Sequence, residues 1–222
     1  MLRFVSFTLA IVAMCNGQIA VERDPVCGTR NGFYGIEGNC DAYVECRDYR
    51  SREMQCPDGL HFDPAVAWPN YPCGYPMEVD CAGRGIAQPA QPSAECPHLY
   101  GFFPSPKATA DECGYYRMCV DGVAVEMACP PGLAFNPSNA RCDWPDTVST
   151  CNAAAFLGFT CPPPPVNEIG ELIEGPVNYK YEGNCFAFFS CEEGRARLLS
   201  CDAGYGFDPV SGRCVDGDII KC

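Results

Sequence analysis

The spacing of its cysteines constrains the fold of this chain more than any other feature. Eighteen of the 19 cysteines fall into three sets of six. The gaps within a set are 12, 5, 9, 16 and 7 residues in the first, 16, 5, 9, 12 and 8 in the second, and 23, 5, 9, 12 and 7 in the third. Because the gaps of five and nine never change, we predict three homologous cysteine-rich modules.

The N-terminus resembles a secretory signal peptide. Residues 1–3 form a short basic region, residues 4–14 an apolar run too short to span a bilayer, and residues 15–17 place small side chains at a cleavage site. Cleavage would remove residues 1–17, including Cys15, and leave an even number of cysteines for disulfides in an oxidising compartment. A retained membrane anchor is the alternative. We expect the mature protein to be secreted and extracellular.

The charge of the chain excludes some partners. Its net charge is −13, so nucleic acid and anionic membrane surfaces would repel it. Cationic or neutral partners remain compatible with this charge.

The constant gap of nine predicts a β-hairpin in each module. In the second module this gap holds two β-patterned runs joined by Asp121-Gly122, a favoured turn dipeptide, and Glu193-Gly194 occupies the same place in the third. The first module has Asp48-Tyr49 there, and the absence of glycine predicts a different turn. The expected fold class is three tandem, small, disulfide-rich all-β modules of short antiparallel hairpins and loops, with little helix.

The boundaries follow from the cysteine sets. The modules are predicted at 25–81, 96–151 and 161–222. The linker at 82–95 is small, polar and proline-containing, which indicates flexibility. The linker at 152–160 is partly apolar, which favours docking of the second module against the third. Modules of about 55 residues bury little apolar surface, so disulfides worth roughly 2–4 kcal/mol each are expected to stabilise them.

Signatures of catalysis and metal binding are missing from the sequence. The two histidines, His61 and His98, lie in different modules, and no Cys-x-x-Cys or His-x-x-x-His spacing occurs. We therefore expect no enzymatic activity, no cofactor and no metal.

Aromatic residues recur in every module. A nine-residue frame appears as CPDGLHFDP, CPPGLAFNP and CDAGYGFDP, and a ring also recurs between the second and third cysteines. The candidate rings are Tyr43, Phe62, Tyr75, Tyr116, Phe135, Trp144, Phe188 and Phe207. They either form the small core of each module or serve as platforms on which sugar rings stack. The polar residues after the phenylalanines, Asp63, Asn136 and Asp208, either cap their own turns or hydrogen-bond a sugar.

These residues resemble a known family. The six-cysteine pattern, the frame C-P-x-G-L-x-F-(D/N)-P and the C-D-W-P of the second module resemble the peritrophin-A type chitin-binding domain, also called carbohydrate-binding module family 14. Three such modules behind a signal peptide resemble the obstructor group of arthropod cuticular proteins. That resemblance implies a secreted protein that organises chitin.

The resemblance also implies a disulfide pairing, namely first to third, second to sixth and fourth to fifth within each module. In this chain the pairs would be Cys27–Cys46, Cys40–Cys81, Cys56–Cys73, Cys96–Cys119, Cys113–Cys151, Cys129–Cys142, Cys161–Cys191, Cys185–Cys222 and Cys201–Cys214. Sugar contacts are implied between the fourth and fifth cysteines, where Asn136 has the usual amide and Asp63 and Asp208 depart from it. Module one has four extra residues there, including Trp68, and module three lacks the ring after its fifth cysteine.

The function predicted from sequence is non-catalytic, multivalent chitin binding in cuticle or apical extracellular matrix. The expected partners are chitin, including a partly deacetylated form, and other cuticle matrix proteins. Three alternatives remain, which are a chitin-binding protein of the gut peritrophic matrix, a disulfide-rich protease inhibitor, and a scaffold whose acidic face binds cationic partners.

Overall fold

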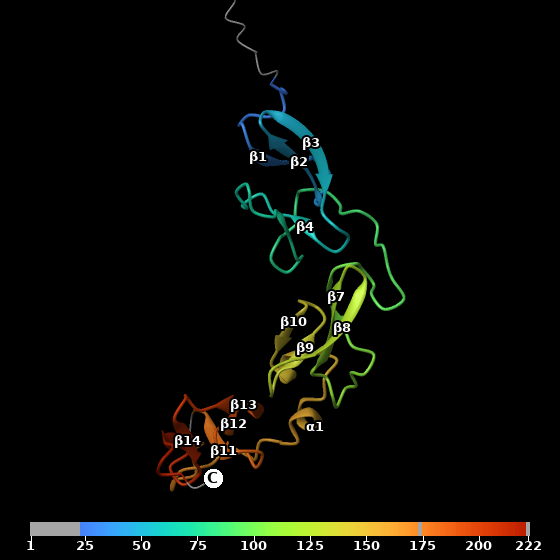
Figure 1. Ribbon diagram of the computed structural model, residues 1–222. Coiled ribbons are helices and arrows are strands. Elements are labelled where there is room, and N and C mark those ends of the chain that lie inside the picture. Colours follow the sequence, from blue (N-terminus) through green and yellow to red (C-terminus); the bar gives the residue numbers. More distant parts are fainter. Residues whose placement is uncertain (1–22, 173–174, 221–222) are drawn as a thin grey trace, which may run out of the picture.

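The computed structural model describes residues 23–172 and 175–220, so the predicted signal peptide lies outside the described residues. Figure 1 shows three modules that follow one another along the chain, coloured from blue to red. Each consists of a three-stranded antiparallel sheet followed by a two-stranded hairpin. The predicted all-β, disulfide-rich class is confirmed.

The strands repeat in the same order in each module. Module one has β1 (Gly32–Gly35), β2 (Ala42–Arg47), β3 (Arg50–Gln55), β4 (His61–Phe62) and β5 (Cys73–Gly74). Module two has β6 (Gly101–Pro104), β7 (Tyr115–Val120), β8 (Val123–Ala128), β9 (Ala134–Asn136) and β10 (Arg141–Asp143). Module three has β11 (Val177–Lys180), β12 (Ala187–Glu192), β13 (Arg195–Ser200), β14 (Tyr205–Asp208) and β15 (Arg213–Asp216).

The hairpin register explains the invariant gap of nine. The third cysteine is the fifth residue of β2, β7 or β12, and the fourth directly follows β3, β8 or β13. The two strands pair from end to end, so only two residues remain for each turn. An added or deleted residue would move one cysteine to the wrong face of the sheet.

The hairpin turn of module one corrects the sequence prediction. Asp48 and Tyr49 both have positive φ, 52° and 63°, as do the turn residues of the other two modules. The same turn therefore forms without glycine, against the conformational preference of both residues. Neighbouring groups hold it, because the Asp48 amide donates to Asn31 Oδ1 at 2.9 Å, the Tyr49 amide donates to the Arg30 carbonyl at 2.9 Å, and the Arg30 Nε donates to Asp48 Oδ1 at 2.7 Å.

Eight disulfides lie within the described residues, and each has the pairing that the family resemblance implied. They are Cys27–Cys46, Cys40–Cys81, Cys56–Cys73, Cys96–Cys119, Cys113–Cys151, Cys129–Cys142, Cys161–Cys191 and Cys201–Cys214. Their Cα atoms are 5.5–6.0 Å apart, which suits the bond. Cys185 is disulfide-bonded, and its expected partner Cys222 lies outside the described residues.

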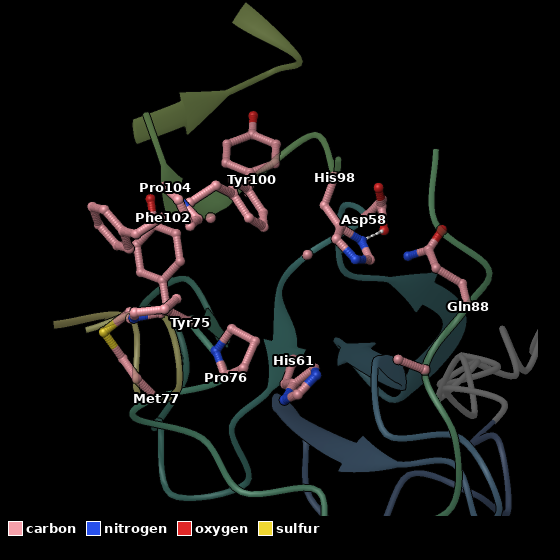
Figure 2. Close-up of a pocket in the computed structure, with 16 residues that line it drawn as sticks. Asp58, His61, Tyr75, Pro76, Met77, Gln88, His98, Tyr100, Phe102 and Pro104 are labelled. Atoms are coloured by element: carbon pink, nitrogen blue, oxygen red, sulfur yellow. Dashed lines mark hydrogen bonds and ion pairs between the residues drawn. The ribbon is translucent and has the colours of Figure 1, made fainter. Parts of the chain in front are cut away.

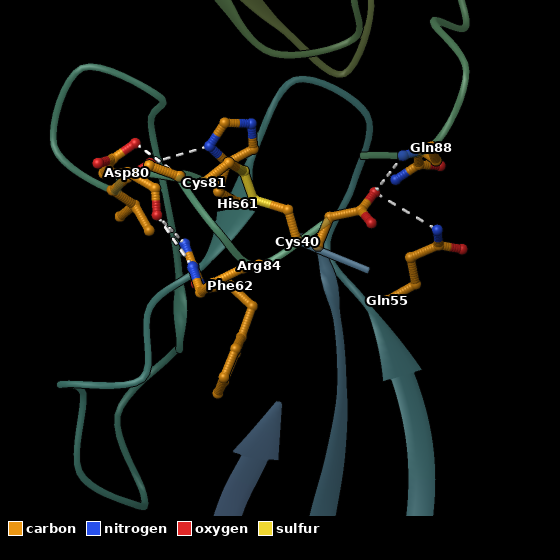
Figure 3. The surroundings of a disulfide bond; sticks show 11 residues. Cys40, Gln55, His61, Phe62, Asp80, Cys81, Arg84 and Gln88 are labelled. Atoms are coloured by element: carbon orange, nitrogen blue, oxygen red, sulfur yellow. Dashed lines mark hydrogen bonds between the residues drawn. A yellow bond between two sulfur atoms is a disulfide. The ribbon is translucent and has the colours of Figure 1, made fainter. Parts of the chain in front are cut away.

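The segment after module one is bound to that module, although its composition predicts a flexible linker. The Gln88 amide donates to buried Asp41 Oδ2 at 2.9 Å, and the Gln88 side chain donates to the Cys56 carbonyl at 2.6 Å. Ile86 forms a β-bridge with Asn39. Figure 3 shows Gln88 beside the Cys40–Cys81 disulfide, on the same side as Gln55, whose side chain also donates to Asp41 Oδ2 at 3.4 Å. The linker thus supplies backbone and side-chain groups that are hydrogen-bonded to module one.

The second linker contains a short helix that joins two modules. Helix α1 (Ala153–Leu157) begins at Asn152, whose side chain accepts the Ala155 amide at 3.4 Å. Phe156 packs against the core of module two, whereas Phe159 stacks on Phe189 of module three with ring centroids 4.2 Å apart. Modules two and three therefore dock through this apolar linker. The preceding single turn of 3-10 helix, η1 (Pro145–Thr147), belongs to module two. Within the described residues, the chain offers no helical segment that could cross a membrane.

Candidate functional site

The recurrent rings form one stacked pair in each module. Tyr43 lies on Phe62, Tyr116 on Phe135, and Phe188 on Phe207, with centroid distances of 5.0, 5.0 and 4.9 Å and interplanar angles of 14°, 15° and 13°. Each pair joins the three-stranded sheet to the two-stranded hairpin. The pair is the repeated aromatic core of the module.

Burial divides these recurrent rings into two groups. Phe62, Phe135 and Phe207 are only 2%, 4% and 3% exposed, and Tyr43 is 5% exposed. A ring that stacks on sugar needs an open face, so these four side chains fill the core because each small module has few other large apolar groups. Tyr116 and Phe188 are half-buried, so they keep some surface that a ligand could reach.

The polar residues after the phenylalanines cap their own turns. Asp63 Oδ1 accepts the Ala65 amide at 2.9 Å, Asn136 Oδ1 accepts the Ser138 amide at 3.1 Å, and Asp208 Oδ1 accepts the Val210 amide at 3.0 Å. The turn-capping interpretation of these residues is therefore observed. Hydrogen bonds from Ser211 and then from the Val210 amide hold the pKa of Asp208 below its ordinary value.

The ring after the fifth cysteine lies at a boundary between modules. Tyr75 of module one packs against Phe102 of module two, with ring centroids 4.8 Å apart. Trp144 of module two lies under the guanidinium of Arg197 from module three, 4.9 Å from the ring centroid. Module three has Asp216 at this position. Tyr75 and Trp144, which are predicted sugar contacts, thus also pack against the next module.

The glycine of the repeated frame marks the same boundaries. A Cβ on Gly59 would lie 1.9 Å from the Tyr100 carbonyl oxygen of module two, and one on Gly132 would lie 2.7 Å from Leu198 Cβ of module three. A Cβ on Gly204 of module three would have no atom within 4 Å. Only glycine therefore allows the close approach at the two module boundaries.

Asp58 is a buried residue between modules one and two that no sequence motif identifies. It is 1% exposed, and its carboxylate accepts hydrogen bonds from His98 Nδ1 at 2.7 Å, the Leu99 amide at 3.0 Å and the Gln91 amide at 2.8 Å. Its backbone carbonyl accepts the Tyr100 amide at 3.0 Å. We call this set of bonds the Asp58 latch. Burial alone would raise the pKa of Asp58, but His98 and the two amides together hold it below its ordinary value.

The sequence does carry a signal for this latch. Asp58 is the third residue of Cys-Pro-Asp-Gly, whereas the corresponding residues in modules two and three are Pro131 and Ala203. Asp58 is buried, whereas Pro131 and Ala203 are exposed. The one copy with a carboxylate is therefore also the one that is covered, and a buried charge needs a partner because leaving it unpaired is strongly unfavourable.

Exposed rings are a second group that recurrence does not reveal. They lie at positions that differ between modules, and each module has at least one. The exposed fractions are 36% for Trp68, 61% for Tyr71, 44% for Tyr115, 55% for Phe186 and 48% for Tyr205. Tyr71 and Trp68 come from the four extra residues of module one, on the segment where the family resemblance implied sugar contact.

One group of metal-ligand residue types occurs in the described chain. Potential ligand atoms of Cys40, His61 and Cys81 lie within 4.8 Å of one another. Figure 3 shows the two cysteines joined in a disulfide beside His61. Disulfide sulfurs are not thiolates, so this group offers a metal only the imidazole while the bond is intact.

These features together define a protein class, namely tandem small β-modules that are each stabilised by disulfides. A family model described as Chitin binding Peritrophin-A domain matches residues 27–81, 96–151 and 174–222. The chain therefore belongs to the peritrophin-A chitin-binding family. The third match begins after Cys161, although that cysteine is bonded to Cys191 inside the match.

Individual relatives agree with the family match. The chain is 37% identical to protein obstructor-E of Drosophila melanogaster over 221 residues, which cover 96% of this chain and 87% of that protein. It is 33% identical to peritrophin-1 of Anopheles gambiae over 49% of this chain and 71% of that protein. Chondroitin proteoglycan 2 of Caenorhabditis briggsae is 29% identical over 88% of this chain but only 42% of its own length.

Proposed function

We propose that this protein is a secreted, non-catalytic protein that binds chitin through several modules and organises or protects it in cuticle or apical extracellular matrix. The observation that carries the proposal is the presence of three peritrophin-A modules in one chain that is similar to obstructor-E along nearly its whole length. The disulfides support secretion, because they persist in oxidising extracellular compartments.

The exposed rings are the proposed sugar contacts. An accessible aromatic face packs against the apolar face of a sugar ring, whereas Phe62, Phe135 and Phe207 are buried. We assign this role to Trp68 and Tyr71 in module one, Tyr115 and Tyr116 in module two, and Phe186, Phe188 and Tyr205 in module three. The Asx residues Asp63, Asn136 and Asp208, together with Tyr75 and Trp144, contribute the surface that remains accessible beside their structural roles.

Repetition gives the proposal its mechanism. A shallow site on a small module binds a polymer weakly, but linked sites meet a repeating ligand at high effective concentration. Avidity can then exceed the affinity of one site by roughly 10²–10⁴-fold. A polymer of identical sugars presents the same face many times and suits such a protein.

The test is retention of the secreted protein on insoluble chitin, with cellulose and chitosan in parallel at two salt concentrations. Retention on chitin that does not change with salt supports stacking on a neutral sugar polymer. Binding only to chitosan at low salt would instead mean that acidic side chains and a deacetylated polymer dominate. Absence of retention on every polymer would reject the carbohydrate proposal.

A double variant sharpens the assignment of contacts. Replacing Trp68 and Tyr71 by alanine removes the exposed rings of module one, and we expect weaker retention on chitin. The matched control replaces Val66, a half-buried aliphatic residue on the same segment, by alanine. Equal retention of both variants would remove these rings from the proposed site.

Peritrophic matrix is the second candidate location, supported by the similarity to peritrophin-1. The sequence favours cuticle, because its linkers are not rich in serine and threonine and it has no N-glycosylation site. Immunolocalisation in epidermis and gut would separate the two locations.

A further inference from the structure

Modules one and two enclose a cleft that belongs to neither module alone. Its volume is about 340 Å³, within the range of roughly 300–1,000 Å³ that small-molecule sites occupy. Figure 2 shows the labelled side chains around an open space, with Tyr75, Phe102 and Met77 on one side and His98, Asp58 and Gln88 on the other.

The two walls of the cleft are fixed relative to each other. The Asp58 latch joins them through His98, Leu99 and Tyr100. Arg141 of module two donates to the Met77 carbonyl at 3.2 Å on the opposite side. The cleft therefore exists before a ligand arrives, which lowers the entropy lost on binding.

The lining is aromatic and almost free of net charge. Tyr75, Tyr100, Phe102 and Phe103 contribute rings, while Gln88 and His98 contribute polar groups. Asp58 is the one carboxylate among the described lining residues, and its two oxygens already accept three hydrogen bonds. In a protein with a net charge of −13, a neutral pocket of rings and a few polar groups suits a neutral, polyhydroxylated ligand.

We propose that this cleft is a carbohydrate subsite shared by two modules, which takes one or two N-acetylglucosamine units of a chitin chain. The inference rests on the proposed function and adds a place where two modules bind one stretch of polymer together. Tyr75 and Phe102 provide the stacking faces, and His98 and Gln88 provide polar groups for hydroxyl or acetamide groups.

The test uses the full secreted chain and the soluble trimer of N-acetylglucosamine, titrated by calorimetry. Ala87→Trp places a large ring at the cleft lining, and we expect it to weaken trimer binding about tenfold or more. The matched control is Ala90→Trp on the same exposed segment but outside the lining, and its affinity should stay within about twofold of wild type. Hydrogen exchange provides a second measurement, because bound trimer should protect the amides of Gly101, Phe102 and Phe103.

The outcomes separate this inference from the proposed function. Retention of wild-type protein on insoluble chitin tests the proposed function by itself. If that retention is observed but Ala87→Trp binds the trimer as tightly as Ala90→Trp, the shared cleft is rejected. Absence of measurable trimer binding, or protection confined to other parts of the chain, would reject it as well.

Discussion

The two boundaries between modules use the same positions of the upstream module but different surfaces of the downstream one. At both, the frame glycine and the ring after the fifth cysteine contact the following module. Module two is met at its N-terminal segment, from His98 to Phe102, whereas module three is met on β13, at Arg197 and Leu198. The upstream modules thus use the same positions for the contact, whereas the downstream modules are contacted on different surfaces.

The chemistry of the two boundaries also differs. The first is held by the buried Asp58 latch, and the second by a cation–π contact of Arg197 with Trp144 and by apolar packing of Phe159. Pro131 replaces the latch residue in module two, and at the second boundary the linker residues Phe156 and Phe159 contact the two modules instead. We therefore expect the first boundary to depend on hydrogen bonds and pH, and the second on packing.

The largest effect is expected at Gly59. Gly59→Ala forces a Cβ against the Tyr100 carbonyl at a residue with φ of +92°, so strain and overpacking together should destabilise the boundary by about 3 kcal/mol or more. Faster hydrogen exchange of the Leu99 and Tyr100 amides would report this opening. Gly204→Ala is the control, since its φ is +87° with open space around it and left-handed strain alone costs about 1–2 kcal/mol. Equal destabilisation by the two variants would contradict the close packing of Gly59 against module two.

Removal of the latch should come next. Asp58→Ala leaves the partly buried Gln91 amide, Leu99 amide and His98 Nδ1 without their carboxylate acceptor, and we expect a loss of about 1–3 kcal/mol. Urea unfolding and exchange of the Leu99 amide would measure the loss. Asp63→Ala removes a carboxylate that caps only its own turn, so it should leave the Leu99 amide protected. Rapid exchange of the Leu99 amide in both variants would mean that its protection does not depend specifically on Asp58.

The pH dependence of stability should change with the latch. The pKa of Asp58 is lowered in the folded protein, so its contribution to stability is fully present above about pH 4, near its unfolded pKa, and is lost as pH falls through the folded pKa. Urea unfolding between pH 6 and pH 2 should therefore show a steeper acid loss in wild type than in Asp58→Asn. Parallel pH profiles would show that the carboxylate is not coupled to folding.

The smallest effect is expected at the second boundary. Arg197→Ala removes the cation over Trp144, a contact worth about 0.5–1 kcal/mol at a partly exposed site, and with it a long ion pair to Asp146 at 4.0 Å. The thermal midpoint should fall slightly, and the Leu99 amide of the first boundary should keep its protection. Arg195→Ala, on the same strand but paired only with exposed Glu193, should have less effect. A larger loss for Arg195→Ala would contradict this assignment.

Cysteine spacing predicted the modules and the hairpins because it acts through backbone register. The sequence pattern did not predict local conformation where contacts between distant segments determine it. Asp48-Tyr49 adopts the glycine-type turn because Arg30 and Asn31 bond it, and the linker after module one is ordered because Asp41 and Cys56 accept its amides. Sequence recurrence likewise identified the aromatic core rather than the exposed rings, since every copy of a small fold needs the same interior.

The bonded linkers change how three modules meet a polymer. A slack tether lets each module search for its own sugar, so almost any spacing of ligand is accepted. Here Gln88 and Gln91 are bonded to module one, and Phe156 and Phe159 join modules two and three. These contacts therefore fix the spacing between the modules when the chain folds. If the exposed rings bind sugar as proposed, we expect this chain to bind an ordered polymer array whose repeat matches its own spacing better than a disordered one.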